Sequence, residues 1–495
     1  MLFVHNEHIV RLFRVCCSGI FLLFLLPRFR AQNMPTQEAL HAVDQLVDRS
    51  EPIHLAEVLT KQYGPRLTGS RHLRQATGWA VHEMNRAGLS HVHTESWTMA
   101  RGWRRLHAKA RLTQPYRSEL TVSSYGWSGS SHGAVQGDVV LVDGNAKLTE
   151  ESTREWTGKI VLVAPVANDG IRAVADARIL AELAEKAHAL AVIDGIGRPG
   201  RDIVHTGPIG FPGQTTSVPF LGMPATQRQE LEALVRKGAA PRLEIDIANK
   251  FTQGPVTAEN VVGDIQGTVH PEQIVLVGAH LDSWDLSSGA ADDAAGVAAV
   301  LAAARAIRSS GVHPDRTIRF VLFSGEEQGL LGSSAYVERH RRELANYVCA
   351  LIMDWGAGPI TRFPLAGHAE LGKPLDALFS SSDALNSIRT SSGFLTFTDG
   401  FAFTLAGLPG IGLLQDSPNY DRVAHSTEDS LQAIDADALR FNTRVLALSA
   451  LWLSDWPQKP GTIFTESENE QALQPVRNVL QLFGMWPYEH MTSPN

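Results

Sequence analysis

The stretch of sequence that decides the fold is residues 274–285, which read IVLVGAHLDSWD. Its first four residues are aliphatic and mostly β-branched, a pattern that predicts a strand buried on both faces. His280, Asp282 and Asp285 follow at the point where the apolar run ends. A strand of this kind is typical of a mainly parallel sheet, in which functional side chains collect at the carboxyl ends of the strands.

Strands and helices alternate on the carboxyl side of this stretch. Apolar runs predict strands at 317–323, 347–353 and 410–414, and an Ala/Val-rich segment predicts a helix over 294–307. Upstream, apolar residues at helical spacing predict helices over 38–62 and 72–87, on either side of a break at Gly64–Ser70. The alternation predicts an α/β domain with a mainly parallel central sheet and helices on both faces.

The pattern of predicted secondary structure changes between 119 and 253. Short β-like runs lie at 139–142, 159–163 and 189–193, with one helix expected over 171–188 and a Gly/Pro-rich loop over 195–219. We interpret this segment as an inserted β-rich domain. The α/β domain then consists of two pieces, 32–118 and 254–458, and residues 459–495 form a polar tail to which we assign no function.

The N-terminus resembles a secretory signal peptide. Arg11 and Arg14 precede a short apolar stretch at 15–26, and cleavage after Ala31 would remove it. The stretch is short for a membrane span. We therefore expect a secreted or periplasmic protein, with an uncleaved N-terminal anchor as the alternative.

The same segment contains two of the three cysteines, so the mature chain would retain only Cys349. A single cysteine cannot form an intramolecular disulfide, and its apolar surroundings predict a buried, inert thiol. The formal net charge of −8 gives no indication of nucleic-acid binding. The local basic cluster Arg101, Arg104 and Arg105 is interpreted as a solvated face.

Histidines and carboxylates recur where the predicted strands end, and five of them make a ligand set for two zinc ions. We expect His280 and Asp354 to bind one ion, Glu327 and His425 the other, and Asp292 to bridge both. Zinc binds imidazole nitrogen and carboxylate oxygen, and two neighbouring ions need a ligand with two donor atoms. The Gly/Ala/Ser-rich loop before Asp292 lets the chain turn back toward His280.

Two further carboxylates have other expected roles. Glu326 adjoins a ligand but points elsewhere, so we interpret it as the general base that takes a proton from a water between the metals. Asp282 is expected to accept the second N–H of His280 and thereby fix its tautomer. Taken singly, these residues also fit helix capping at Asp292–Asp293 or a helix start at Glu326, and only the joint pattern favours catalysis.

The segments His280–Asp285 and Gly289–Asp293 resemble the metal loop of the co-catalytic two-zinc exopeptidase family, and within it a carboxypeptidase branch. Gly64–Ser70, His205–Gly207 and Glu326–Gly329 extend the resemblance over the mature chain, as do Asn346–Tyr347, Thr398–Asp399, Gly407–Gly410 and His425–Ser426.

This resemblance implies a zinc-peptidase α/β sandwich interrupted by a protease-associated domain. It implies two Zn²⁺ per chain, the ligand set given above, Glu326 as base and a cis bond at Asp292–Asp293, and the frequent pairing of family members implies a homodimer. The expected substrate is a dipeptide or short peptide, cleaved by a carboxypeptidase or dipeptidase mechanism. The chain departs from the family pattern at Ile352–Met353 and at Asp421–Ala424, which puts the substrate preference in doubt.

Several alternatives stay open at this point. An aminopeptidase of the same family uses the same metals, and the sequence does not place the group that would hold either end of a peptide. A single-zinc cyclase-type relative would bind one metal, and a non-catalytic relative would lack ligands or base. A serine hydrolase is disfavoured because Gly126–Ser130 lacks the second glycine of a nucleophile elbow. His205–Gly207 is either a lid over the substrate or part of a surface module.

Overall fold

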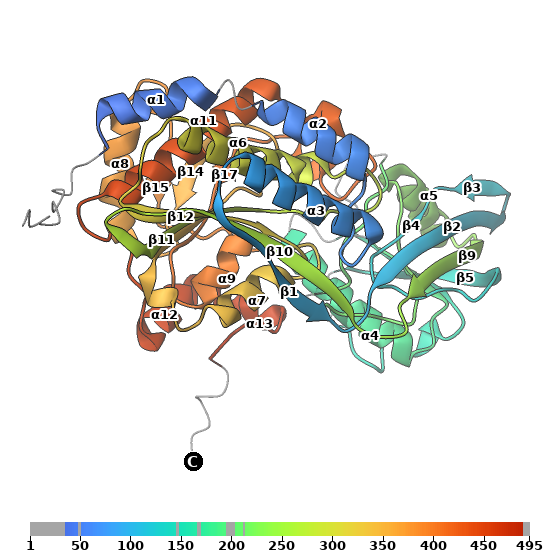
Figure 1. The fold of residues 1–495 in the computed structure, drawn as a ribbon. Coiled ribbons are helices and arrows are strands. Elements are labelled where there is room, and N and C mark those ends of the chain that lie inside the picture. The colour runs from blue at the N-terminus through green and yellow to red at the C-terminus, as the bar shows by residue number, and fades with distance from the viewer. Residues whose placement is uncertain are drawn as a thin grey trace, which may run out of the picture. The chain divides into compact units, whose positions relative to one another are not determined.

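The computed structural model describes residues 35–47, 51–144, 148–165, 170–194, 203–210 and 213–488. A six-stranded sheet forms its centre (Figure 1), and its last four strands run parallel. In spatial order the strands are β1 (Ser90–Met99), β10 (Val256–Ile265), β12 (Arg316–Phe323), β11 (His270–His280), β13 (Tyr347–Ile352) and β16 (Gly410–Gly412). The predicted mainly parallel sheet is confirmed, with β1 and β10 as an antiparallel extension.

Helices cover both faces of this sheet, as predicted (Figure 1). One face carries α1 (Gln37–Val47), α2 (Pro52–Tyr63), α3 (Arg71–Arg86), α6 (Ala295–Ser309), α8 (Gly372–Ser380) and α11 (Ala436–Asp455). The other carries α7 (Leu331–Arg339) and α9 (Asp399–Leu405), with α12 (Glu466–Leu473) and α13 (Arg477–Leu482) packed against α9.

Side chains of β11 point alternately to the two faces of the sheet and contribute to the hydrophobic core on each face. Val275, Val277 and Ala279 belong to the α6 side, whereas Ile274 and Leu276 belong to the α7 side. This is the period of two that a strand imposes on its side chains. A strand buried on both faces is therefore the reason that residues 274–279 contain no charge.

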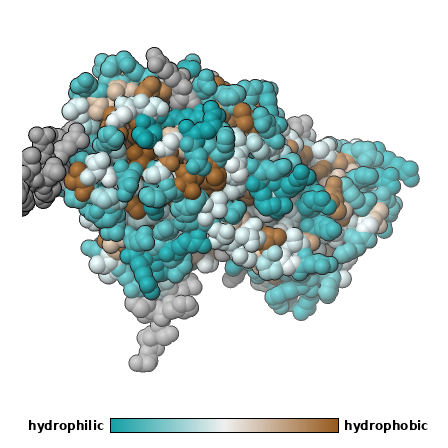
Figure 2. Space-filling model, in the orientation of Figure 1, coloured by the Kyte–Doolittle hydropathy of each residue, from teal (hydrophilic) through white to brown (hydrophobic). Residues whose placement is uncertain are grey.

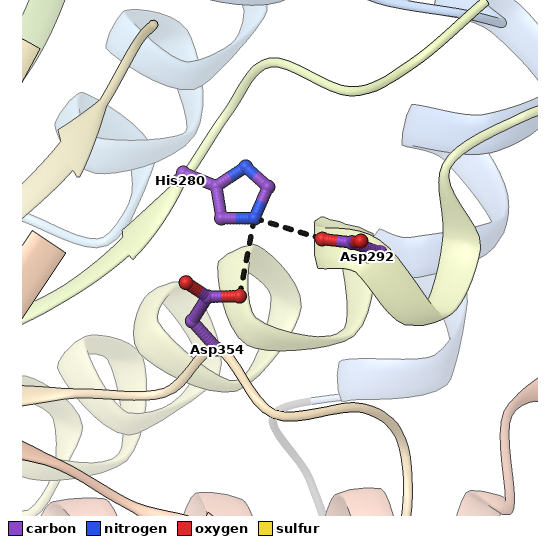
Figure 3. A group of neighbouring side chains, drawn as sticks. All are labelled: His280, Asp292 and Asp354. Carbon is purple, nitrogen blue, oxygen red and sulfur yellow. Dashed lines mark hydrogen bonds and ion pairs between the residues drawn. The ribbon is translucent and has the colours of Figure 1, made fainter. Parts of the chain in front are cut away.

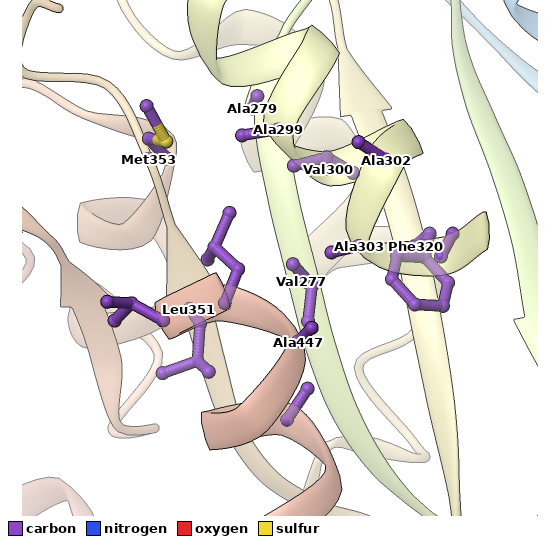
Figure 4. Packing of buried hydrophobic residues seen from close by; sticks show 14 of the residues in the cluster. Val277, Ala279, Ala299, Val300, Ala302, Ala303, Phe320, Leu351, Met353 and Ala447 are labelled. Atoms are coloured by element: carbon purple, nitrogen blue, oxygen red, sulfur yellow. The ribbon is translucent and has the colours of Figure 1, made fainter. Parts of the chain in front are cut away.

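Helix α6 is the element nearest the centre of the larger core. Its alanines Ala299, Ala302 and Ala303 are almost wholly buried beside Val277 and Ala447 (Figure 4). Small side chains allow the helix to lie close to both the sheet and α11. The close packing fixes the helix that starts directly after Asp292 and Asp293.

A second sheet of eight strands draws on residues 103–251. Its spatial order is β3 (Ser118–Leu120), β2 (Trp103–Gln114), β9 (Arg242–Phe251), β5 (Val135–Val142), β6 (Ile160–Val163), β7 (Ala191–Ile193), β8 (Phe220–Gly222) and β4 (Ser123–Ser124). Helices α4 (Gly170–Lys186) and α5 (Ala225–Arg236) accompany it. Strand β2 begins before residue 119, where we expected the insert to start, and the domain boundaries themselves stay a prediction.

Three local expectations differ from the structure. The helix expected over 38–62 is two helices, because Glu51 has φ of 54° and Pro52 begins α2. The strand expected at 410–414 is divided between β16 and β17 (Leu414–Gln415), and β17 joins a small sheet with β14 (Ile360–Pro364) and β15 (Arg389–Ser391). The tail is not uniformly polar, since it contains α12 and α13 and its Leu473, Leu480 and Trp486 are buried against α9.

The predicted signal peptide lies outside the described residues. Of the helices that are described, none is long and apolar enough to cross a membrane. Hydrophilic side chains predominate on the face drawn in Figure 2, with hydrophobic residues scattered among them. Cys349 is buried in β13, as expected, and burial raises the pKa of its thiol to about 12.

Candidate active site

The predicted ligands meet at the carboxyl edge of the parallel strands. His280 is the last residue of β11, Asp354 follows β13, and Glu326 and Glu327 follow β12. His425 comes from the loop after the short helix α10 (Tyr420–Val423). Residues far apart in the sequence are therefore brought together because parallel strands end at one edge.

The first group of side chains is His280, Asp292 and Asp354 (Figure 3). His280 Nε2 lies 3.0 Å from Asp292 Oδ1 and 3.3 Å from Asp354 Oδ1. All three side chains are buried. Their donor atoms can converge on one ion, because they lie within 4.8 Å of one another.

The second group is Asp292, Glu327 and His425. His425 Nε2 lies 3.0 Å from Glu327 Oε2 and 3.3 Å from Asp292 Oδ2. The two oxygens of Asp292 therefore face different histidines, with Oδ1 toward His280 and Oδ2 toward His425. This is the arrangement expected of a carboxylate that serves two cations, although the role of each ligand stays a prediction.

The chemistry of the donors fits divalent cations. Burial raises the pKa of Glu327 to about 7, with the Asp292 charge adding to it, and burial raises the pKa of Asp354 to about 6 although His280 lowers it. Among the described residues, Glu327 Oε1 is buried without a hydrogen-bond partner. Crowded buried carboxylates need a counter-charge, and imidazole nitrogen with carboxylate oxygen is a donor set that zinc prefers.

The loop that presents Asp292 is held from two sides. The buried Arg66 guanidinium donates to the backbone oxygens of Leu281, Ser288 and Gly289. The Asp429 Oδ1 oxygen accepts the backbone N–H groups of the two alanines that precede Asp292, at 2.9 and 2.7 Å. These contacts explain why a loop of small residues can position a ligand.

Two features of the loop backbone accompany these contacts. Gly289 has φ of 63°, and a Cβ there would lie 2.3 Å from the Cβ of Ser283, so only glycine fits. The Asp292–Asp293 peptide bond is cis, as the resemblance implied. Asp293 accepts the N–H of Gly296 and so caps the start of α6 rather than joining the ligand groups.

Asp282 was expected to accept the second N–H of His280 with its carboxylate, but its nearest contact with that ring is through its backbone oxygen. His280 Nδ1 is 3.0 Å from the Asp282 carbonyl oxygen and 3.7 Å from its carboxylate Oδ1. The carboxylate accepts the Thr68 hydroxyl at 2.6 Å and the Glu326 N–H at 3.4 Å. Asp282 thus connects the His280 ligand to the turn that carries the proposed base.

Glu326 sits among carboxylates. Burial, with the neighbouring Asp354 charge, raises the pKa of Glu326 well above its ordinary value. Asp399, on α9, contributes to the same negative environment, and burial raises the pKa of its carboxyl to about 8. A carboxylate whose affinity for a proton is increased in this way suits proton transfer.

Sequence reasoning missed some residues that shape the site. Arg66 and Thr68 belong to the quoted Gly64–Ser70 motif, but no role was assigned to them. Asp429 gave no signal, because an acidic residue in a polar loop resembles any solvated one. The departure from the family pattern at Ile352–Met353 is structural, since Met353 belongs to the core on the α6 side of the sheet and Ile352 to the core on the α7 side.

Comparison with known proteins is consistent with this geometry. The family model described as peptidase family M28 matches residues 260–450, a range that contains all five predicted ligands. The crystal structure of a peptidase M28 precursor from Shewanella amazonensis SB2B superposes with a TM-score of 0.73 at 29% identity. That likeness covers 84% of this chain and 96% of the other. The chain thus matches peptidase family M28 over residues 260–450 and is similar to an M28 peptidase over most of its length.

Individual relatives of this M28 peptidase carry two kinds of name. Carboxypeptidase Q of Homo sapiens is 27% identical over 400 residues, covering 80% of this chain and 84% of the relative. Aminopeptidase YwaD of Bacillus subtilis is 29% identical over 372 residues, covering 71% and 77%. BSAP, a zinc aminopeptidase from Bacillus subtilis, shares the fold with a TM-score of 0.62 at 20% identity, covering 80% and 93%.

The comparisons confirm the resemblance to this family and to its carboxypeptidase branch. The M28 peptidase is thus a hydrolase of the metallo-exopeptidase type. Both kinds of relative match most of the chain, so the end from which it trims a peptide is a separate question.

Proposed function

We propose that this M28 peptidase is a two-zinc exopeptidase that hydrolyses dipeptides or short peptides from the carboxyl end. The observation that carries the proposal is the placement of Asp292, whose two oxygens face His280 and His425 separately. Because one carboxylate is shared by both groups, the same five side chains can bind two ions rather than one. His280 and Asp354 would complete one site, and Glu327 and His425 the other.

The metal site, Glu326 and the residues that position it have different roles in the proposed hydrolysis. Bound zinc ions would lower the pKa of a water and polarise the carbonyl of the scissile bond. Glu326 takes a proton from the attacking water as oxygen adds to the carbonyl carbon, and gives it to the amine nitrogen as the C–N bond breaks. Asp282 and Thr68 hold the turn that carries Glu326 against the His280 strand.

The direction of trimming rests on similarity. Carboxypeptidase Q relatives match about four fifths of the chain, for example 80% for the Mus musculus protein. The aminopeptidase alternative is supported by the 29% identity to YwaD. The identities are close, and the longer match to carboxypeptidase Q, 80% of the chain against 71% for YwaD, supports trimming from the carboxyl end.

Paired blocked dipeptides test the direction on protein of measured zinc content. We expect cleavage of an N-acylated dipeptide and no cleavage of its C-amidated counterpart. Cleavage of the amidated peptide alone would identify an aminopeptidase with the same metal chemistry. Cleavage of unblocked dipeptides alone would identify a dipeptidase, and no turnover with two metals bound would favour the non-catalytic alternative.

We also propose export through the N-terminal segment described above. Arg11, Arg14 and the apolar stretch at 15–26 support this proposal. N-terminal sequencing of protein recovered outside the cell tests it, and Gln32 is the expected first residue. Full-length chain retained in the membrane fraction would favour an uncleaved anchor instead.

A further inference from the structure

Arg105 is bonded to three separate segments of the chain. Its side chain is only 13% exposed, so its interpretation as part of a solvated face was wrong. Nε and Nη2 donate to the two carboxylate oxygens of Asp285 at 3.1 and 2.7 Å. Nη1 donates to the Ser123 hydroxyl at 2.6 Å and also contacts the backbone oxygen of Ser124, while Nη2 reaches Thr206 Oγ1 at 3.2 Å.

Thr206 connects this guanidinium to a predicted metal ligand. Its backbone N–H donates to the carbonyl oxygen of His425 at 2.8 Å, and its own hydroxyl donates to Ser124 O at 3.1 Å. His205 and Ser426 form an antiparallel bridge beside this bond. The segment 204–207, which lies between β7 and β8, is therefore joined directly to the backbone of His425.

The backbone of His425 needs such support. Its φ is 58°, in the left-handed region that non-glycine residues rarely adopt. Residues in such conformations persist where their surroundings hold them. The Thr206 N–H fixes the carbonyl of His425 while the imidazole faces Asp292 and Glu327.

The ring of His425 also packs against Trp284, the residue that precedes Asp285. The Trp284 ring lies 5.8 Å from the His425 ring and 6.3 Å from the Trp127 ring. A Cβ on Gly126 would lie 2.2 Å from Trp284, so the indole is enclosed by the second sheet. The Arg105 guanidinium binds Asp285, which neighbours Trp284, and it also binds Thr206. The two groups that contact His425 here, the Trp284 ring and the Thr206 N–H, are therefore both connected to Arg105.

We propose that Arg105 is a positioning residue for His425, through Thr206 on one side and the Trp284–Asp285 loop on the other. The inference rests on the proposed two-metal function. It assigns to the second sheet a part in assembling the site, beyond that of a lid or a surface module. Arg105 touches neither the predicted ligands nor the base, and both of its routes reach the site at His425.

The test is metal binding by Arg105→Met in the full chain. Cobalt titration is followed by metal analysis and by visible absorption, with His425→Ala marking the signal of the affected group. We expect the His425 group to lose about 10- to 100-fold in cobalt affinity, the range for residues that orient ligands. The His280 group should bind as in the wild type.

Arg104→Met is the matched control, because Arg104 neighbours Arg105 on β2 but is exposed. It should leave both affinities unchanged. Arg105→Lys keeps the charge without the planar fork and should recover little affinity. Thr206→Val removes one acceptor while retaining the backbone N–H, and gives a milder test if Arg105→Met does not fold.

Three results would overturn the inference. The first is unchanged cobalt affinity of both groups in Arg105→Met and in Thr206→Val. The second is an equal loss of affinity from both groups in Arg105→Met together with a lower unfolding midpoint. The third is wild-type affinity in Arg105→Lys. Failure of the proposed function is seen separately, because a wild-type chain that binds one metal contradicts the two-metal site before any variant is compared.

Discussion

Each oxygen of the Asp292 carboxylate faces a different histidine, so this residue has the widest role in the predicted site. Replacing Asp292 by alanine should therefore empty both metal groups. Replacing Asp354 by alanine should empty only the group that contains His280. Metal analysis after dialysis measures both, and an Asp292→Ala protein that keeps one tightly bound zinc would show that the carboxylate does not bridge.

Glu326 is predicted to move protons without binding metal. Glutamine keeps the size and hydrogen bonding of the side chain but cannot accept the proton of the attacking water. Glu326→Gln should retain zinc at the wild-type content and lose about 10²- to 10⁴-fold in kcat. Metal content and peptide hydrolysis are measured on the same preparation, and loss of zinc from this variant would exchange the roles of base and ligand.

For single residues, the sequence predicts well which polar side chains lie at the end of a strand. His280, Glu327 and Asp354 were predictable because each polar group follows an apolar run that can only be a buried strand. Arg105 was not, because a charged residue in an alternating stretch resembles a solvent-facing one until its partners are known. Its partners come from distant segments, and no local pattern encodes them.

Among the elements, α11 and β12 are linked by a buried acid whose titration is expected to affect stability. Asp455 Oδ1 accepts the backbone N–H of Asp315 at 2.8 Å, and burial raises the pKa of the Asp455 carboxyl to about 6. The native state then binds more protons than the unfolded chain between pH 4 and 6. Its free energy of unfolding therefore falls as the pH rises through this window.

Asp455→Asn should remove this dependence, because asparagine keeps the acceptor and has no charge. We expect the variant to gain stability relative to the wild type on going from pH 4.5 to 7, on the order of 2 kcal/mol. Urea midpoints followed by tryptophan fluorescence in the presence of a chelator measure it. Asp437→Asn, at an exposed position of the same helix, is the control and should follow the wild type.

Element boundaries were less predictable than element types. The periodicity over 38–62 continues across the break at Glu51 and Pro52, and Pro52, which begins α2, was the local signal of the break that the periodicity obscured. The division of 410–414 between two sheets also depends on tertiary pairing, since β17 is antiparallel to β14 while β16 is parallel to β13. Side-chain pattern alone does not specify such partners.

For the whole molecule, metal binding should contribute to stability, because the ligands converge only in the native fold. Zinc at 100 times its dissociation constant stabilises by about 2.7 kcal/mol per site. A chelator should therefore lower the thermal unfolding midpoint, and added zinc should restore it. Differential scanning calorimetry measures this change, and Asp292→Ala, which lacks both groups, should not respond.

The fold class could be read from the sequence because strand and helix periods alternate over the whole second half of the chain. The arrangement of the second sheet could not, since its strands pair in the order β3-β2-β9-β5-β6-β7-β8-β4. This order combines residues from both ends of the segment. The predicted boundaries at 119 and 253 therefore rest on composition alone.

The spread of the ligands along the chain has a consequence for biosynthesis. His280 and His425 are separated by most of the second half of the sequence, and His425 is held by Thr206 from a segment made much earlier. Contacts of such long sequence separation form late in folding. A ribosome-bound chain that ends before residue 425 has one complete cluster of predicted donors at most, so we expect hydrolysis to begin only after synthesis has passed the last predicted ligand.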